Sequence, residues 1–224
     1  SVFWSADKLP ALYEFRYLLE SAALIIVIIN ERISPNKICT ALFLSGILPA
    51  GLAVYQFTQQ DIFAFKWLGL AAHQAINPGT IVIEAAGRWL RAYGPFNHPN
   101  VLGGWLSLSF LSGLIILARG RVNTYLRRAI IFISPLITAG IFFSFSRSAW
   151  LVLLIAAGLF IYFERGNFRR RESDKKYYPA SQIIFSAALF LLLSVIYSPL
   201  ISARTNSANR LEIISTSERA DQLS

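Results

Sequence analysis

Long apolar runs alternate with short polar segments along most of the chain. Six of these runs, with their flanking residues, are about long enough to cross a hydrocarbon core of roughly 30 Å as helices. The predicted spans are residues 11–29, 38–57, 101–117, 129–145, 148–163 and 183–200. Together they predict an all-α polytopic membrane protein, a single membrane domain over residues 1–224 with about six transmembrane helices.

Polar and small residues inside the first two spans predict local features. Charges are expensive inside a bilayer unless they are paired, and Arg16 and Glu20 are four residues apart, so we expect them to pair on one helical face. The second span contains Gly46, Pro49 and Gly51, which suit a bent and closely packed helix.

The longest connection, residues 59–97, has a different pattern. Its first half mixes aromatic and aliphatic residues with a lysine and a histidine, which is typical of a helix lying in the membrane interface. Residues 77–79 break this helix, and Thr80 is placed to cap a second one. On that second helix Arg88 and Arg91 are three apart and would point the same way. We therefore expect two amphipathic helices within this connection.

Composition excludes most soluble classes of protein. Hydrophobic residues make up 55% of the chain and charged residues only 15%. The net charge of +9 is gathered in short clusters between the apolar runs, whereas a nucleic-acid-binding protein would carry its arginines on soluble faces. We therefore expect a lipid bilayer, and no nucleic acid, as a partner. The single cysteine, Cys39, excludes an internal disulfide and a cysteine-based metal site. Because the chain has no methionine and no cleavable signal before the first span, we expect a fragment of a longer protein.

The distribution of basic residues predicts the orientation. One set of loops contains two basic residues, then four arginines, then six basic residues. The other set is poorer in every short loop and has only Arg147 between the fourth and fifth spans. Because positive charge accumulates in cytoplasmic loops, the first set is expected to face the cytoplasm. The N-terminus, the connection 59–97, the Arg147 turn and the polar tail 201–224 are expected to face outward.

Several cationic side chains are thereby expected to gather on the outer side. They are Arg88, Arg91, His98, Arg147, Arg204 and Arg210. Arginine presents a planar fork that binds phosphate at two points. Helix N-termini at Pro99 and just after Ser148 would add backbone N–H groups and positive dipole ends. Such a cluster suits an anionic headgroup, above all the diphosphate of a lipid-linked substrate.

Simpler interpretations compete for some of these residues. Arg88 and Arg91, taken singly, fit snorkelling anchors beside a span. Arg147 favours a functional role, because any polar residue would serve so tight a turn. His98 could act as a general base or simply complete a turn. The histidines are too far apart for a metal site, and no nucleotide-sugar carboxylate pair, phosphate-binding glycine loop or serine triad occurs. We therefore expect no metal and no other cofactor.

Three segments resemble motifs of the bacterial O-antigen ligase and polymerase family. Residues 91–102, RAYGPFNHPNVL, resemble its R-x-x-G-x-F-x-H-P-N-x-L segment. Residues 146–151, SRSAWL, are similar to its S-R-(G/S)-A-W-L span start. Residues 209–214, NRLEII, resemble its G-R-x-x-x-W entry to a large periplasmic loop, although Ile214 stands where the family commonly has tryptophan. The matches follow the family's order, and all fall on the expected outer side.

The resemblance implies a GT-C-like, metal-independent, inverting glycosyltransferase of the bacterial cytoplasmic (inner) membrane, with its active face outward. Such enzymes move a glycan from undecaprenyl diphosphate to lipid A-core in ligases, or to another glycan in polymerases. The family's two essential arginines would fall on Arg147 and Arg210, which would hold the diphosphate and stabilise it as a leaving group. Diphosphate or glycan contacts would come from Arg88, Arg91, His98, Asn100 and Arg204. The family's catalytic histidine lies further along the large loop that residues 201–224 would begin, so we expect this chain to be inactive alone.

Two other functions stay open on the sequence. A transporter or flippase for lipid-linked glycans would need charges or broken helices near mid-membrane on several spans, and only Glu20, Pro49 and Pro135 offer them. A membrane scaffold would use its arginines only to set topology. Arginine-to-lysine exchanges separate these functions, because topology would survive them and bidentate diphosphate binding would not.

Overall fold

A computed structural model describes residues 8–68, 70–77, 80–85, 87–119, 122–168 and 177–205. The chain divides into two compact units, residues 1–38 and 39–224, and each is described by itself. The described part of the first unit is α1 (Lys8–Asn30) and the first residues of α2. The second unit is mostly helical and contains everything that bears on the site.

Helix α1 confirms the ion pair expected from its sequence. Arg16 Nε lies 3.2 Å from Glu20 Oε1, on an exposed face of the helix. The Arg16 guanidinium also lies over the rings of Tyr13 and Tyr17, at 5.3 and 5.0 Å from their centroids. The charge of Arg16 is thus stabilised by Tyr13, Tyr17 and Glu20, which are its neighbours on the same helix.

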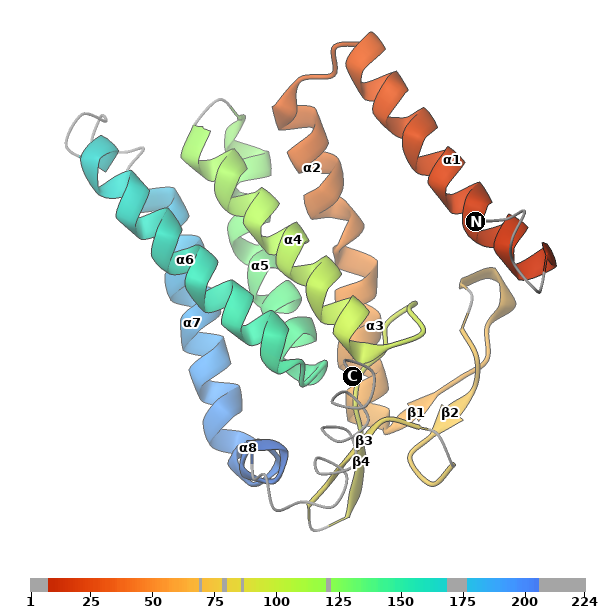
Figure 1. Cartoon of the computed structure of the whole chain (residues 1–224). Coiled ribbons are helices and arrows are strands. Elements are labelled where there is room, and N and C mark those ends of the chain that lie inside the picture. The colour runs from red at the N-terminus through yellow and green to blue at the C-terminus, as the bar shows by residue number, and fades with distance from the viewer. Residues whose placement is uncertain are drawn as a thin grey trace, which may run out of the picture. The chain divides into compact units, whose positions relative to one another are not determined.

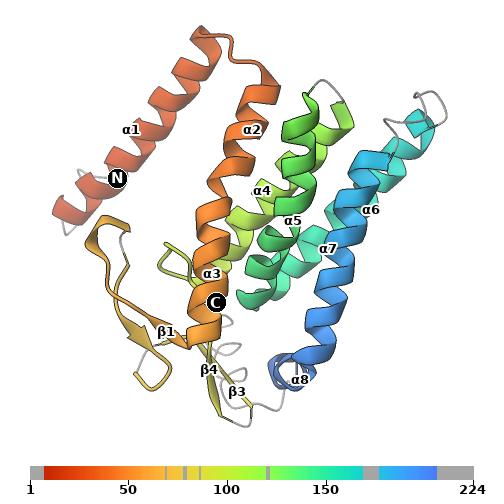
Figure 2. The ribbon, with the colours of Figure 1, turned by 180° about the vertical axis from the view of Figure 1, so that it is seen from behind.

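The second unit is built mainly from long helices that lie side by side, and the connections between successive helices alternate between the two ends of this bundle (Figures 1 and 2). They are α2 (Pro35–Ser45), which belongs to this unit from Cys39 on, α3 (Ile47–Gln59), α4 (Pro99–Arg119), α5 (Thr124–Phe143), α6 (Arg147–Phe168), α7 (Tyr177–Ile196) and the short α8 (Ser198–Thr205). Helix α5 packs against α3, α4 and α7, and α6 packs mainly against α4. Among the described residues, four helical segments are long and apolar enough to cross a membrane: Pro35–Gln59, Pro99–Arg119, Thr124–Phe143 and Tyr178–Ile196.

These four segments agree with four of the six expected spans. The apolar part of α6, Arg147–Tyr162, is shorter, and α1 carries four charged residues, Lys8, Glu14, Arg16 and Glu20. The count of six transmembrane helices and the GT-C-like architecture therefore stay predictions. Large aliphatic side chains are exposed along α6 and α7, including Leu154 at 68% and Val195 at 74%. Such a surface suits contact with lipid.

The bend and close packing expected in the second span are both present. The span is interrupted between α2 and α3 at Gly46, and Pro49 removes the backbone donor that the last carbonyl of α2 would otherwise meet. A Cβ placed on Gly46 would overlap the Ser109 side chain of α4. The Ser109 hydroxyl donates to the carbonyl of Phe43 at 3.0 Å, which stabilises the bend.

The expectation of amphipathic helices within residues 59–97 is wrong. The described residues of this connection form two short antiparallel hairpins, β1 (Asp61–Ile62) with β2 (His73–Gln74) and β3 (Val82–Glu84) with β4 (Arg88–Leu90), and one 3-10 turn, η2 (Lys66–Leu68). Two glutamines at the end of α3, Gln56 within the helix and Gln60 at its C-cap, hold the second hairpin and the segment after it in place. Gln60 Oε1 accepts from Leu90 N at 2.7 Å, and Gln56 Oε1 accepts from Tyr93 N and Gly94 N at 3.0 and 2.8 Å.

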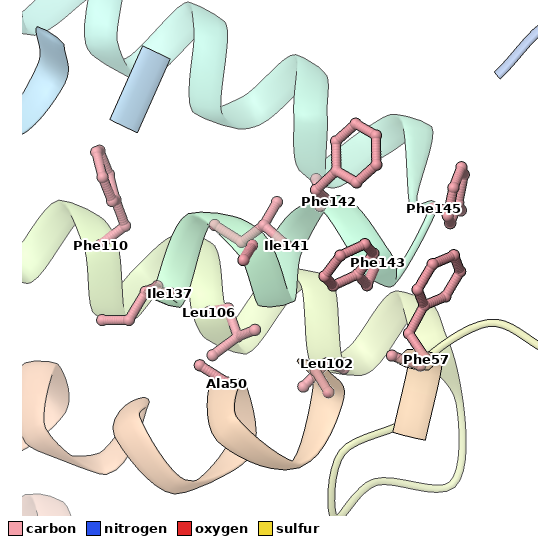
Figure 3. Close-up of a cluster of buried hydrophobic side chains, with 14 of the residues drawn as sticks. Ala50, Phe57, Leu102, Leu106, Phe110, Ile137, Ile141, Phe142, Phe143 and Phe145 are labelled. Carbon is pink, nitrogen blue, oxygen red and sulfur yellow. The ribbon is translucent and has the colours of Figure 1, made fainter. Parts of the chain in front are cut away.

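A cluster of aromatic side chains fills the core where α3 ends, α5 ends and α6 begins. Figure 3 shows Phe57, Phe142, Phe143 and Phe145 close together at this place. The rings of Phe57 and Phe143 are stacked, with centroids 4.3 Å apart, and the edge of Tyr197 packs against both rings. This rigid aromatic cluster supports the turn that leads into Arg147.

Candidate functional site

The turn between α5 and α6 is fixed by its own serines. Ser144 Oγ donates to the carbonyl of Ile141 at 2.6 Å and accepts from Ser146 N at 3.3 Å. Ser146 then caps α6, because its Oγ accepts from Ala149 N at 3.4 Å. As a result α6 begins at Arg147, whose side chain is exposed while Ser144 and Ser146 are buried.

Phe145 holds this turn in a strained conformation. Its φ is 45°, in the left-handed region, which a bulky residue adopts at a cost of about 1–3 kcal/mol. The side chain is fully buried, with its ring 5.6 Å from that of Phe57 and 5.7 Å from that of Trp150. Burial of the Phe145 ring thus compensates for the backbone strain. It also determines the position at which the side chain of Arg147 projects from the protein surface.

Arg91 connects this turn to the start of α4. Its side chain is only 2% exposed, and its Nε donates to the carbonyl of Ser144 at 2.8 Å. Its Nη2 donates to Asn100 Oδ1, also at 2.8 Å. Ala92 N donates to the carbonyl of Phe143 at 3.0 Å, so the whole segment lies along the end of α5. The buried guanidinium of Arg91 thus joins the start of α4, nine residues away, to the end of α5, 53 residues away.

The electrostatics of Arg91 bring two further arginines into the site. Its pKa is lowered from the usual value of an arginine to about 9, first by burial and then by the positive charge of Arg204, with a smaller contribution from Arg147 and an opposing one from Tyr93. Arg204 belongs to α8, which packs against β3. Arg91 donates to a carbonyl oxygen of Ser144 and to an amide oxygen of Asn100, and both of these acceptors are neutral. The site therefore concentrates positive charge, which a bound anion would stabilise.

The other predicted site residues are placed less uniformly. Arg88 is exposed in β4 and lies opposite Glu84, three residues from Arg91 along an extended strand and therefore about 10 Å away. It does not share a face with buried Arg91, so the helical spacing expected for this pair is wrong. Asn100 is in the site through Arg91. Arg210 lies outside the described residues.

His98 has a structural contact at the start of α4. Its Nδ1 accepts from Asn100 N at 3.0 Å, in the manner of a helix cap. Of the two sequence interpretations, this contact supports the one in which His98 completes a turn. By positioning Asn100, it also acts indirectly on the acceptor that holds Arg91.

Gln56 is the residue of this region that the sequence did not identify. It is fully buried at the end of α3, where its Nε2 donates to the carbonyl of Gly94 at 3.0 Å while its Oε1 accepts from two backbone groups. A lone amide in an apolar run was the available signal. Within the described part of the chain, no group of three or more His, Cys, Asp or Glu residues gathers that could hold a metal ion.

Comparisons with protein families, with curated proteins and with solved structures found no match to this chain. The assignment of function therefore rests on the geometry of the site and on the motifs in the sequence.

Proposed function

We propose that the chain is part of a membrane glycosyltransferase of the O-antigen ligase type, and that Arg91, Asn100, Arg147 and Arg204 form its binding site for the diphosphate of a lipid-linked glycan. The observation that supports this proposal is the convergence of three arginines from β4's end, the start of α6 and α8. The glycan would pass from undecaprenyl diphosphate to an acceptor sugar on the outer face of the bacterial cytoplasmic membrane. A polymerase of the same family would use the same donor site with another glycan as its acceptor.

The arginines would have different tasks. Arg91 is buried and fixed by two hydrogen bonds, so it shapes the turn and holds its guanidinium in one position. Arg147 is exposed at the first residue of α6, where the helix dipole adds to its charge. Glycosyl transfer leaves negative charge on the departing diphosphate, and a preorganised cation stabilises that charge in the transition state. In this proposal Arg147 contacts the leaving group, and Arg210 would approach it from the polar tail.

The experiment compares Arg147→Ala, Arg147→Lys and Arg128→Ala in the full-length protein. Arg128 is an exposed arginine near the start of α5, so it is a matched control at the opposite end of that helix. We expect Arg147→Ala to lower transfer from an undecaprenyl-diphosphate donor by about 100-fold or more. Arg147→Lys should lose most of the transfer, because lysine lacks the planar fork. Expression and membrane insertion should stay normal in all three variants.

Two results would overturn the proposal. The first is normal transfer by Arg147→Ala. The second is an equal loss in Arg128→Ala, which would mean that the arginines act through topology alone, as in a scaffold.

A further inference from the structure

A groove of about 250 Å³ lies between α4 and α6, beside the guanidinium cluster. From α4 it is lined by Asn100, Gly104, Leu108 and Leu111 among others, and from α6 by Ser148 and Val152. The α4 residues are spaced by three or four, so they form one face of that helix. From Asn100 to Leu111 this face is about 16 Å long, which is close to half of a hydrocarbon core of roughly 30 Å.

The polarity of the groove changes along its length. Asn100 and Ser148 lie at one end, and Asn100 also accepts from Arg91. Leu108, Leu111 and Val152 line the part further along the two helices. The hydroxyl of Ser107 in the groove wall donates to the carbonyl of Gly103 at 2.8 Å, so it needs no partner inside the groove. The groove therefore joins a cationic end to an apolar interior.

Gly104 is responsible for part of the open space. A Cβ added at Gly104 would meet nothing within 4 Å, whereas one added at neighbouring Gly103 would lie 2.8 Å from the Ala149 Cβ. Gly103 thus lets α4 and α6 approach each other, and Gly104 leaves room beside that contact. A larger side chain at Gly104 would fill the groove without disturbing the contact between the helices.

We propose that this groove holds the first isoprene units of a polyprenyl chain whose diphosphate binds at Arg91 and Arg147. The inference rests on the proposed function and adds the site for the lipid chain. Charge complementarity places the anionic end of the ligand at the arginines. Asn100 contacts Arg91 and also lines the groove, so a ligand bound at the arginines can extend its hydrocarbon chain into the groove. A groove of about 250 Å³ holds part of one prenyl chain and leaves no room for the two acyl chains of a phospholipid.

The test measures binding to the chain in detergent, using farnesyl diphosphate, inorganic diphosphate and dioleoyl phosphatidylglycerol as probes. The variants are Gly104→Leu, which fills the groove, and Gly158→Leu, a matched control on α6 where an added Cβ also meets nothing within 4 Å. The unsubstituted chain should bind farnesyl diphosphate at least about tenfold more tightly than inorganic diphosphate, because the prenyl chain is buried. Gly104→Leu should lose this difference and keep its affinity for inorganic diphosphate. Gly158→Leu should behave like the unsubstituted chain.

The outcomes separate this inference from the proposed function. If Gly104→Leu keeps the full preference for farnesyl diphosphate, the groove is not the chain site, although the diphosphate site stands. If inorganic diphosphate does not bind at all, or binds equally to Arg147→Ala, the proposed function itself fails. Phosphatidylglycerol that competes as well as farnesyl diphosphate, and loses affinity in Gly104→Leu, would assign the groove to a phospholipid instead. Val152→Phe fills the groove from α6 and gives the same comparison if Gly104→Leu does not fold.

Discussion

Replacing Asn100 by aspartate tests whether the site is built for an external anion. Asn100 Oδ1 accepts from Arg91 Nη2 at 2.8 Å, so Asn100→Asp would put a carboxylate beside the buried guanidinium with almost no change of shape. The pKa of Arg91 is lowered from its usual value to about 9, which corresponds to a cost on the order of 5 kcal/mol for keeping it charged. A carboxylate partner would offset part of that cost.

The substitution should move stability and binding in opposite directions. We expect Asn100→Asp to stabilise the folded chain by about 2 kcal/mol, after desolvation of the new carboxylate is subtracted. The same carboxylate would neutralise the charge that attracts diphosphate, so diphosphate affinity should fall by about tenfold or more. A site in which Arg91 served only to hold the turn would gain the stability and leave the binding of diphosphate unchanged.

The assay combines thermal unfolding in detergent, followed by tryptophan fluorescence, with titration of inorganic diphosphate. Asn123→Asp is the control, because Asn123 caps α5 through Leu126 N at 2.7 Å and aspartate caps a helix equally well. It should change neither property appreciably. Unchanged or higher diphosphate affinity in Asn100→Asp would refute the idea that Arg91 and its neighbours form an anion site.

Two further predictions concern the support of the site. Gln56→Ala should lower the free energy of unfolding by about 3 kcal/mol, because the carbonyl of Gly94 and the N–H groups of Tyr93 and Gly94 lose their partner in the core; chemical denaturation would measure the loss. Gly103→Ala should destabilise by about 1–3 kcal/mol, since its Cβ would crowd Ala149, while Gly104→Ala should be neutral or stabilising. Equal melting temperatures for these two alanine variants would contradict the packing described for α4.

The helices could be predicted from the sequence because their signals are local. A run of apolar residues, the Gly46 and Pro49 pair, and the four-residue spacing of Arg16 and Glu20 each act within a few turns of one helix. The bend between α2 and α3 and the ion pair in α1 are confirmed for that reason. The orientation of the chain in a membrane stays a prediction.

The connection 59–97 could not be predicted because its structure depends on distant partners. Gln56 and Gln60 hold the backbone of residues 30 to 38 positions further along the chain. No periodic pattern within the connection carries that information. The three-residue spacing of Arg88 and Arg91 therefore predicts a helix where the chain is extended. Burial of Arg91 follows from the same contacts. Its sequence neighbours gave no sign that it bridges two helices.

Two unfavourable features lie close together at the turn between α5 and α6, a left-handed Phe145 and a buried Arg91. Glycine at position 145 would remove the left-handed strain at Phe145. A neutral residue in place of Arg91 would avoid burying a charge close to Arg204 and Arg147. The ring of Phe145 belongs to the buried aromatic cluster, so its packing offsets the strain of that residue. The strained turn fixes the position of Arg147, and burial holds Arg91 close to it. Both features are explained if the turn is shaped to receive an anion.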